Sequence, residues 1–231
     1  MAAAAGLAAL PCAAGAAAGL PGEVAGVAIP RTPLAGKAAG LARDACPDFL
    51  FNHAMRTYLF GALALRAQKT AYDAELGFVA AALHDLGLVP AYSTPRTSFE
   101  IDGANRAEAV VTSAGRSPDQ GRRVWNAIVF HDMRGEYAAH QSAEARLVGE
   151  GAGADVVGYD PGVIDAKAVA EVLAAFPRLQ FKQKFTALLV DQCRRKPTAQ
   201  IGWLEGLCRA TVPDAPRGSV ERAIAAAPFS E

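Results

Sequence analysis

The stretch AAALHDLGL, residues 80–88, ends an apolar run in an adjacent histidine and aspartate, His84 and Asp85. The residues before the pair fit a buried helix, and Gly87 is a typical place for a helix to close. Neighbouring helix residues point about 100° apart, so both reach one object most easily at a helix end. The pair therefore indicates either a ligand held across a helix terminus or two buried polar groups satisfied by hydrogen bonds.

Outward from this stretch, the chain has mostly helical spacing of apolar residues, and strand-like alternation is scarce. Residues that favour helix starts precede several of the segments: Thr32, Pro47–Asp48, Asp73, Ser117 and Asp165. No repeat period or break in composition interrupts residues 30–210. The sequence predicts an all-α protein, with one helical domain over residues 23–231.

Four further helix boundaries are expected after residue 98. A loop containing Phe99 and Glu100 leads into a helix over about 104–114. The segment SAEARLVGEGAGAD forms a helix that ends in its glycines, with Asp155 on the following turn. Pro177 restarts a helix, and Thr198 caps a last one.

Composition limits the partners. Lys and Arg together number 23, as do Asp and Glu, so no net field recruits nucleic acid or an anionic membrane. We expect a small-molecule substrate, no nucleic acid and no membrane, while homo-oligomer formation stays open. The four cysteines show no metal or disulfide spacing and are read as isolated thiols.

The N-terminus has a different composition. Eleven of the first twenty residues are alanine, and no charged side chain precedes Glu23. Residues 1–22 are interpreted as a low-complexity extension, because an export leader would carry basic residues at its start. A cytoplasmic location follows from this reading, and export through a leader is the alternative.

Two further residues resemble His84 and Asp85 in their surroundings. His53 lies within a helix among large apolar residues, and Asp155 lies between apolar segments. A buried ionised carboxylate is costly unless a cation meets it. No Lys or Arg lies close in sequence to His84, Asp85 or Asp155. A divalent metal ion would satisfy all of these groups.

The order of these residues resembles the HD superfamily of metal-dependent enzymes. The blocks that carry the likeness are LFNHAMRTYLFG, AAALHDLGL, SFEIDGANRAEAV, VWNAIVFHD and LVGEGAGADVVG. Taken in order, they resemble the HD branch that contains the cyanamide hydratases, over roughly residues 25–205. The dipeptide His-Asp alone is a weak signal, whereas the ordered set is specific.

This resemblance implies roles for eight residues. The implied ligands of one divalent ion, Zn²⁺, Fe²⁺ or Mn²⁺, are His53, His84, Asp85 and Asp155. The implied catalytic residues are His131 and His140, and the implied lining of the substrate entrance is Phe99 and Glu100. For His140, an exposed position ahead of a helix is the alternative.

The expected function is a lyase or hydrolase that adds metal-activated water to a small polar substrate, with cyanamide hydration as the named example. The first alternative is an HD phosphohydrolase acting on a nucleotide or phosphomonoester. The second is a non-catalytic module that binds a metal or small ligand. A two-metal centre would require His131 and His140 to converge beside Asp85.

Overall fold

The computed structural model describes residues 19–132, 140–158, 164–196 and 220–229, and these parts are mainly helical. The described α-helices are α1 (Pro33–Ala45), α2 (Asp48–Ala67), α3 (Ala74–Leu83), α4 (Phe99–Ser113), α5 (Pro118–Val129), α7 (Ala143–Val157), α8 (Ala166–Ala175), α9 (Phe181–Arg195) and α11 (Val220–Ala226). Two 3₁₀ helices follow α3, η2 (Leu86–Leu88) and η3 (Pro90–Tyr92). The predicted all-α fold is confirmed.

A short β-hairpin, whose two strands have two residues each, precedes the helices and was not predicted. Its strands β1 (Glu23–Val24) and β2 (Val27–Ala28) pair antiparallel, with Val24 opposite Val27. Ala25 and Gly26 form the turn, both at positive φ. Hairpins of this kind are joined by two left-handed residues, and strands this short show no alternation to detect.

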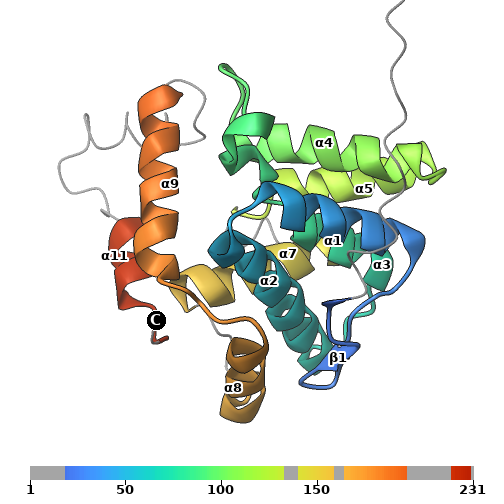
Figure 1. The fold of residues 1–231 in the computed structure, drawn as a ribbon. Helices are drawn as coiled ribbons and strands as arrows, with labels where there is room; N and C mark the ends of the chain where they lie inside the picture. The colour runs from blue at the N-terminus through green and yellow to red at the C-terminus, as the bar shows by residue number, and fades with distance from the viewer. Residues whose placement is uncertain (1–18, 133–139, 159–163, 197–219, 230–231) are drawn as a thin grey trace, which may run out of the picture.

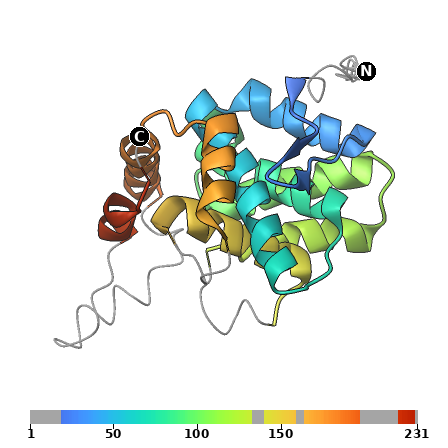
Figure 2. The same ribbon diagram turned by 90° about the horizontal axis from the view of Figure 1, so that it is seen from below.

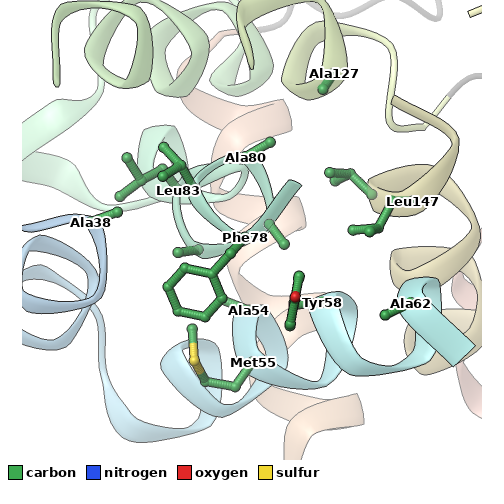
Figure 3. Packing of buried hydrophobic residues seen from close by; sticks show 14 of the residues in the cluster. Ala38, Ala54, Met55, Tyr58, Ala62, Phe78, Ala80, Leu83, Ala127 and Leu147 are labelled. Carbon is green, nitrogen blue, oxygen red and sulfur yellow. The ribbon is translucent and has the colours of Figure 1, made fainter. Parts of the chain in front are cut away.

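Helix α3 lies at the centre of the fold, and it contacts α1, α2, α5 and α7. All of its residues from Leu76 to Leu83 are buried, as expected for a helix that is apolar on every side. Figure 3 shows Phe78 of α3 against Met55 and Tyr58 of α2. The rings of Tyr58 and Phe78 meet edge to face at 5.1 Å. This packing fixes the end of α3, where His84 and Asp85 lie.

Several helix starts lie where the sequence places them. Thr32, Asp73 and Asp165 accept hydrogen bonds from backbone N–H groups in the first turns of α1, α3 and α8. Ser117 and Gln120 form a reciprocal capping box at the start of α5. Helices α9 and α11 lie side by side at one edge of the fold, whereas α8 lies apart from them against α2 and β1 (Figures 1 and 2).

Four predicted boundaries were wrong. Helix α4 begins at Phe99 rather than near residue 104, and α9 begins at Phe181, after two residues with positive φ, rather than at Pro177. Helix α7 runs through its glycines to Val157 and stops at Gly158, so Asp155 lies within the helix. Helix α3 ends at Leu83, before Gly87. The predicted helix at Thr198 lies outside the described residues.

The glycines of α7 do not end the helix because they serve its contact with α2. A Cβ atom on Gly151 would lie 1.9 Å from the Thr57 carbonyl oxygen and 2.9 Å from the Gly61 nitrogen. A Cβ atom on Gly61 would lie 2.1 Å from the Leu147 carbonyl oxygen. The two helix backbones therefore touch, and this contact places Asp155 of α7 beside His53 of α2.

Gly151→Ala is expected to destabilise the protein by about 3 kcal/mol, because a methyl group there meets backbone that cannot move aside. For a chain of this size that loss corresponds to a fall in Tm of roughly 6–12 °C, measured by circular dichroism. The matched control is Gly77→Ala, whose Cβ would meet the flexible end of Leu147 at 3.2 Å. We expect the control to change stability by less than about 1 kcal/mol, because Ala favours the helix. Equal melting of the two variants would contradict the close-contact explanation.

No described helix is both long enough and apolar enough to cross a membrane.

Candidate metal centre

Three buried side chains meet at the end of α3. His53 comes from the middle of α2, His84 follows the last residue of α3, and Asp85 precedes η2. His53 and His84 are fully buried, and Asp85 is 3 % exposed. One nitrogen of each imidazole and one carboxylate oxygen lie within 4.8 Å of one another. The structure therefore brings together three of the four predicted ligands.

The three atoms form a nearly equilateral triangle. The Nε2 atoms of His53 and His84 are 3.2 Å apart, and each lies 3.3 Å from Oδ2 of Asp85. A tetrahedral zinc site with ligand distances of 2.0–2.1 Å places its ligand atoms about 3.3 Å from one another. The spacing of the three atoms therefore matches one face of such a site.

The Nδ1 atoms of both imidazoles, which face away from the triangle, each have a hydrogen-bond acceptor nearby. Nδ1 of His84 lies 2.8 Å from the carbonyl oxygen of Ala81, and Nδ1 of His53 lies 2.6 Å from Oδ2 of Asp155. Because carbonyl and carboxylate oxygens only accept, each Nδ1 carries the hydrogen. In the neutral rings, both Nε2 lone pairs then face the same point as the Asp85 carboxylate.

The carboxylate charge at this point is balanced either by a proton on an imidazole or by a metal cation. Within the described part of the chain, neither oxygen of Asp85 has a hydrogen-bond donor. Burial alone would raise the pKa of Asp85, but protonated His84 and His53 would outweigh this effect and lower the pKa, so the carboxylate is ionised when either ring carries a second proton. An ionised, buried carboxylate beside two imidazole lone pairs is stabilised by a proton or by a metal ion. The residues present fit a divalent metal.

Asp155 is not part of this group. Its carboxylate lies on the opposite side of the His53 ring and is paired with the guanidinium groups of Arg56 and Arg178. Burial alone would raise the pKa of Asp155, but Arg56 and the hydrogen bond from His53 lower it well below its usual range. No basic residue lies close to Asp155 in the sequence, but Arg56 and Arg178 reach its carboxylate from distant segments.

His131 lies beside the centre, whereas His140 is exposed. The His131 ring packs edge to face on the His84 ring at 4.8 Å, and its Nδ1 lies 2.6 Å from the Ile128 carbonyl oxygen. His140 lies in a turn before α7, and no described contact joins it to the centre. The convergence of both histidines beside Asp85, which a two-metal centre would need, is not seen.

Phe99 and Glu100 are both buried. Phe99 contacts the His131 ring at 6.0 Å, and Glu100 is 3 % exposed. Burial raises the pKa of Glu100, and its Oε2 atom has no described hydrogen-bond partner. The two residues therefore lie close to His131.

Helix α9 covers the centre with two aromatic rings that the sequence did not single out. Phe181 and Phe185 lie 4.7 and 5.4 Å from the His53 ring, and their own rings stack at 4.8 Å. At the other end of α9, the buried Lys196 pairs with Asp102 of α4 at 2.8 Å. The helix is thus held at both ends over the candidate metal centre.

A signal in the sequence could have revealed one missed residue. Arg56 lies three positions after His53, so both side chains lie on the same face of α2. Three other missed residues lie far from His53, His84 and Asp85 in the sequence, and no local pattern links them to the site: Arg178, Phe181 and Phe185.

Comparison of the chain with protein-family models and with curated proteins finds no match.

Proposed function

We propose that this protein is a metal-dependent enzyme of the HD type, which adds activated water to a small polar substrate. The observation that supports it is the convergence of three acceptors, from His53, His84 and Asp85, on one buried point. Hydration of a cyanamide-like nitrile is the reaction that the family resemblance offers, with water adding across the C≡N bond to give urea. The chain would then be a hydro-lyase or hydrolase.

Three protein ligands are typical of catalytic rather than structural metal sites, because structural sites have four. His53, His84 and Asp85 would hold Zn²⁺, Fe²⁺ or Mn²⁺ and leave positions for water and substrate. A bound divalent ion lowers the pKa of coordinated water towards neutrality and so supplies a hydroxide nucleophile.

His131 is the residue best placed to move a proton. Its Nδ1–H donates to the Ile128 carbonyl oxygen, so the neutral ring keeps a lone pair on Nε2. The contact with His84 holds the ring next to the centre. Phe99 also contacts the His131 ring and limits its rotation. Glu100, with its raised pKa, is a second buried group that can hold a proton.

The buried cations near the site favour an uncharged substrate over a phosphate. Phosphoryl substrates are usually gripped by arginine or lysine. Here Arg56 and Arg178 bind Asp155, and Lys196 binds Asp102 and the Thr97 carbonyl oxygen. These three side chains are therefore committed within the protein. An HD phosphohydrolase remains the second candidate, and a non-catalytic metal-binding module the third.

The test combines metal analysis with two substrate screens. Protein purified without added metal is examined by elemental analysis, then assayed for urea or ammonia release from cyanamide and for phosphate release from a nucleotide panel. We expect bound divalent metal and product from cyanamide. Phosphate release alone would favour the phosphohydrolase, and metal without either activity would favour the module. Protein that takes up no divalent metal would contradict all three.

A further inference from the structure

We propose that Asp155 is a positioning residue, which orients His53 for metal binding and is not itself a ligand. This role rests on the metal centre proposed above, and it departs from the ligand role that the family resemblance implies. The reason lies in how the carboxylate oxygens of Asp155 are already used.

An ionised carboxylate has about four lone-pair directions, two on each oxygen. Oδ1 of Asp155 accepts hydrogen bonds from Arg56 Nε at 2.8 Å and from Arg178 Nη1 at 2.7 Å. Oδ2 accepts from Arg56 Nη2 at 2.7 Å and from His53 Nδ1 at 2.6 Å. All four directions are filled by N–H donors. A metal ion could bind Asp155 only by displacing one of these charge-assisted bonds.

Asp85 shows the opposite pattern. Its carboxylate is equally buried, yet neither oxygen has a hydrogen-bond donor among the described residues. Oδ2 instead lies at the shared corner of the triangle with the two Nε2 atoms. The two carboxylates therefore have different roles: Asp85 faces the metal position, and Asp155 faces the far side of the His53 ring.

The surroundings of Asp155 also resist its movement towards the metal position. Arg56 is fully buried and Arg178 is 3 % exposed, so both guanidinium groups depend on buried partners. Both lie over the ring of Phe181, at 5.3 and 4.8 Å from its centroid. Moving the carboxylate away would weaken the pairing of two buried cations, which is strongly unfavourable.

The hydrogen bond to Asp155 determines how His53 can bind a metal. It holds the hydrogen on Nδ1 and leaves the Nε2 lone pair directed at the centre, and a carboxylate partner also makes the ring a stronger ligand. Because Arg178 precedes α9, the same carboxylate connects His53 to the helix that covers the site. Asp155 thus fixes both the orientation of His53 and the position of helix α9, which covers the site.

The first experiment compares the metal affinity of Asp155→Asn with that of Asp85→Asn, by competition with a chelator for Zn²⁺. We expect Asp155→Asn to keep the wild-type stoichiometry with an affinity about 10–100-fold lower, as is typical for loss of an orienting partner. Asp85→Asn should bind no metal. Complete loss of metal in an Asp155→Asn protein that keeps its helical circular-dichroism spectrum would show that Asp155 is a ligand.

A second variant gives an answer even if Asp155→Asn does not fold. Arg178→Met removes one donor from Oδ1. If Asp155 orients His53, its carboxylate becomes less fixed and zinc affinity falls several-fold. If Asp155 were a ligand, the freed lone pair would strengthen binding, so an equal or higher affinity overturns the proposal. The matched control is Arg123→Met, which breaks a different arginine–carboxylate pair, with Glu144 at 2.7 Å, and should leave zinc affinity unchanged.

Nuclear magnetic resonance of the imidazole nitrogens tests the orientation directly, and the chain has only four histidines to assign. In wild-type protein loaded with Zn²⁺, we expect His53 to keep a strongly hydrogen-bonded proton on Nδ1. Loss of that proton signal on zinc loading would mean that Asp155 has moved to the metal. If wild-type protein binds no metal, the proposed function fails, while the spectrum of the metal-free protein still shows whether Asp155 holds the Nδ1 proton.

Discussion

Asp85→Asn is expected to abolish divalent metal binding while leaving the protein folded. The substitution keeps the size of the side chain and replaces an anionic oxygen with neutral amide atoms at one corner of the triangle. The remaining His53 and His84 offer two nitrogens without a charge to balance the ion. The loss should therefore exceed the roughly 10–100-fold effect of changing a residue outside the ligand set. Elemental analysis and chelator competition measure it, and circular dichroism checks the helices.

A matched control removes a carboxylate elsewhere. Asp165→Asn alters the N-cap of α8, where the side chain accepts a hydrogen bond from the Ala168 N–H. Because Asn is also a good N-cap residue, we expect little loss of stability and unchanged metal content. His84→Ala should behave like Asp85→Asn. Stoichiometric metal in Asp85→Asn would contradict the assignment of Asp85 as a ligand.

The helical character of the fold could be predicted because its signals are local. A capping residue next to the start of an apolar periodic segment, as at Thr32, Asp73, Ser117 and Asp165, involves only neighbours in the chain. The structure confirms these four starts. The hairpin before α1 is too short to produce a periodic pattern, so it could not be predicted.

The glycines of α7 show why other boundaries could not be read from the chain. Gly151 looks like a helix-ending residue when only its own conformational freedom is considered. In the structure it lies inside the helix, because the Thr57 backbone of α2 occupies the space of a side chain. That requirement comes from a helix almost a hundred residues earlier. The left-handed Gly158 is the glycine that ends α7.

In the candidate site, too, the local features could be predicted from the sequence and the contacts between distant segments could not. His84 and Asp85 are adjacent, and the inference that they serve one buried point needed only the end of their helix. Their approach to His53 depends on how α2 packs on α3, which the local pattern does not contain. The family resemblance grouped His53 with the pair; the three side chains do lie together, and their binding of a metal stays a prediction.

One physical argument from the sequence stays a prediction for Asp85 and missed the partners of Asp155. A buried carboxylate needs a cation, and without a basic neighbour in the sequence a metal was inferred for both. For Asp85, the described structure provides no hydrogen-bond donor, and the inference stands as a prediction. For Asp155, the cations are Arg56, on the same helix face as His53, and Arg178, from the loop before α9. Distance in sequence does not exclude a partner in space.

His131→Gln is expected to retain the metal and to lose about 10²–10⁴-fold in turnover, the usual contribution of a proton-transferring group. The amide can still donate to the Ile128 carbonyl oxygen and pack between His84 and Phe99, so the protein should fold normally. It cannot take up and release a proton near neutral pH. The measurement is kcat for the substrate identified in the screens, with metal content and circular dichroism recorded on the same samples.

The dependence of the rate on pH separates a chemical role of His131 from a purely structural one. If His131 carries a proton, the wild-type profile has a limb that is absent in His131→Gln, whereas a packing defect lowers the rate equally at every pH. The control is Lys167→Ala, at an exposed position on α8, where both rate and profile should match the wild type. Loss of metal from His131→Gln would instead make His131 a ligand, as a two-metal centre requires. A variant with full metal and full turnover would remove His131 from the mechanism and leave the buried Glu100 as the group to test next.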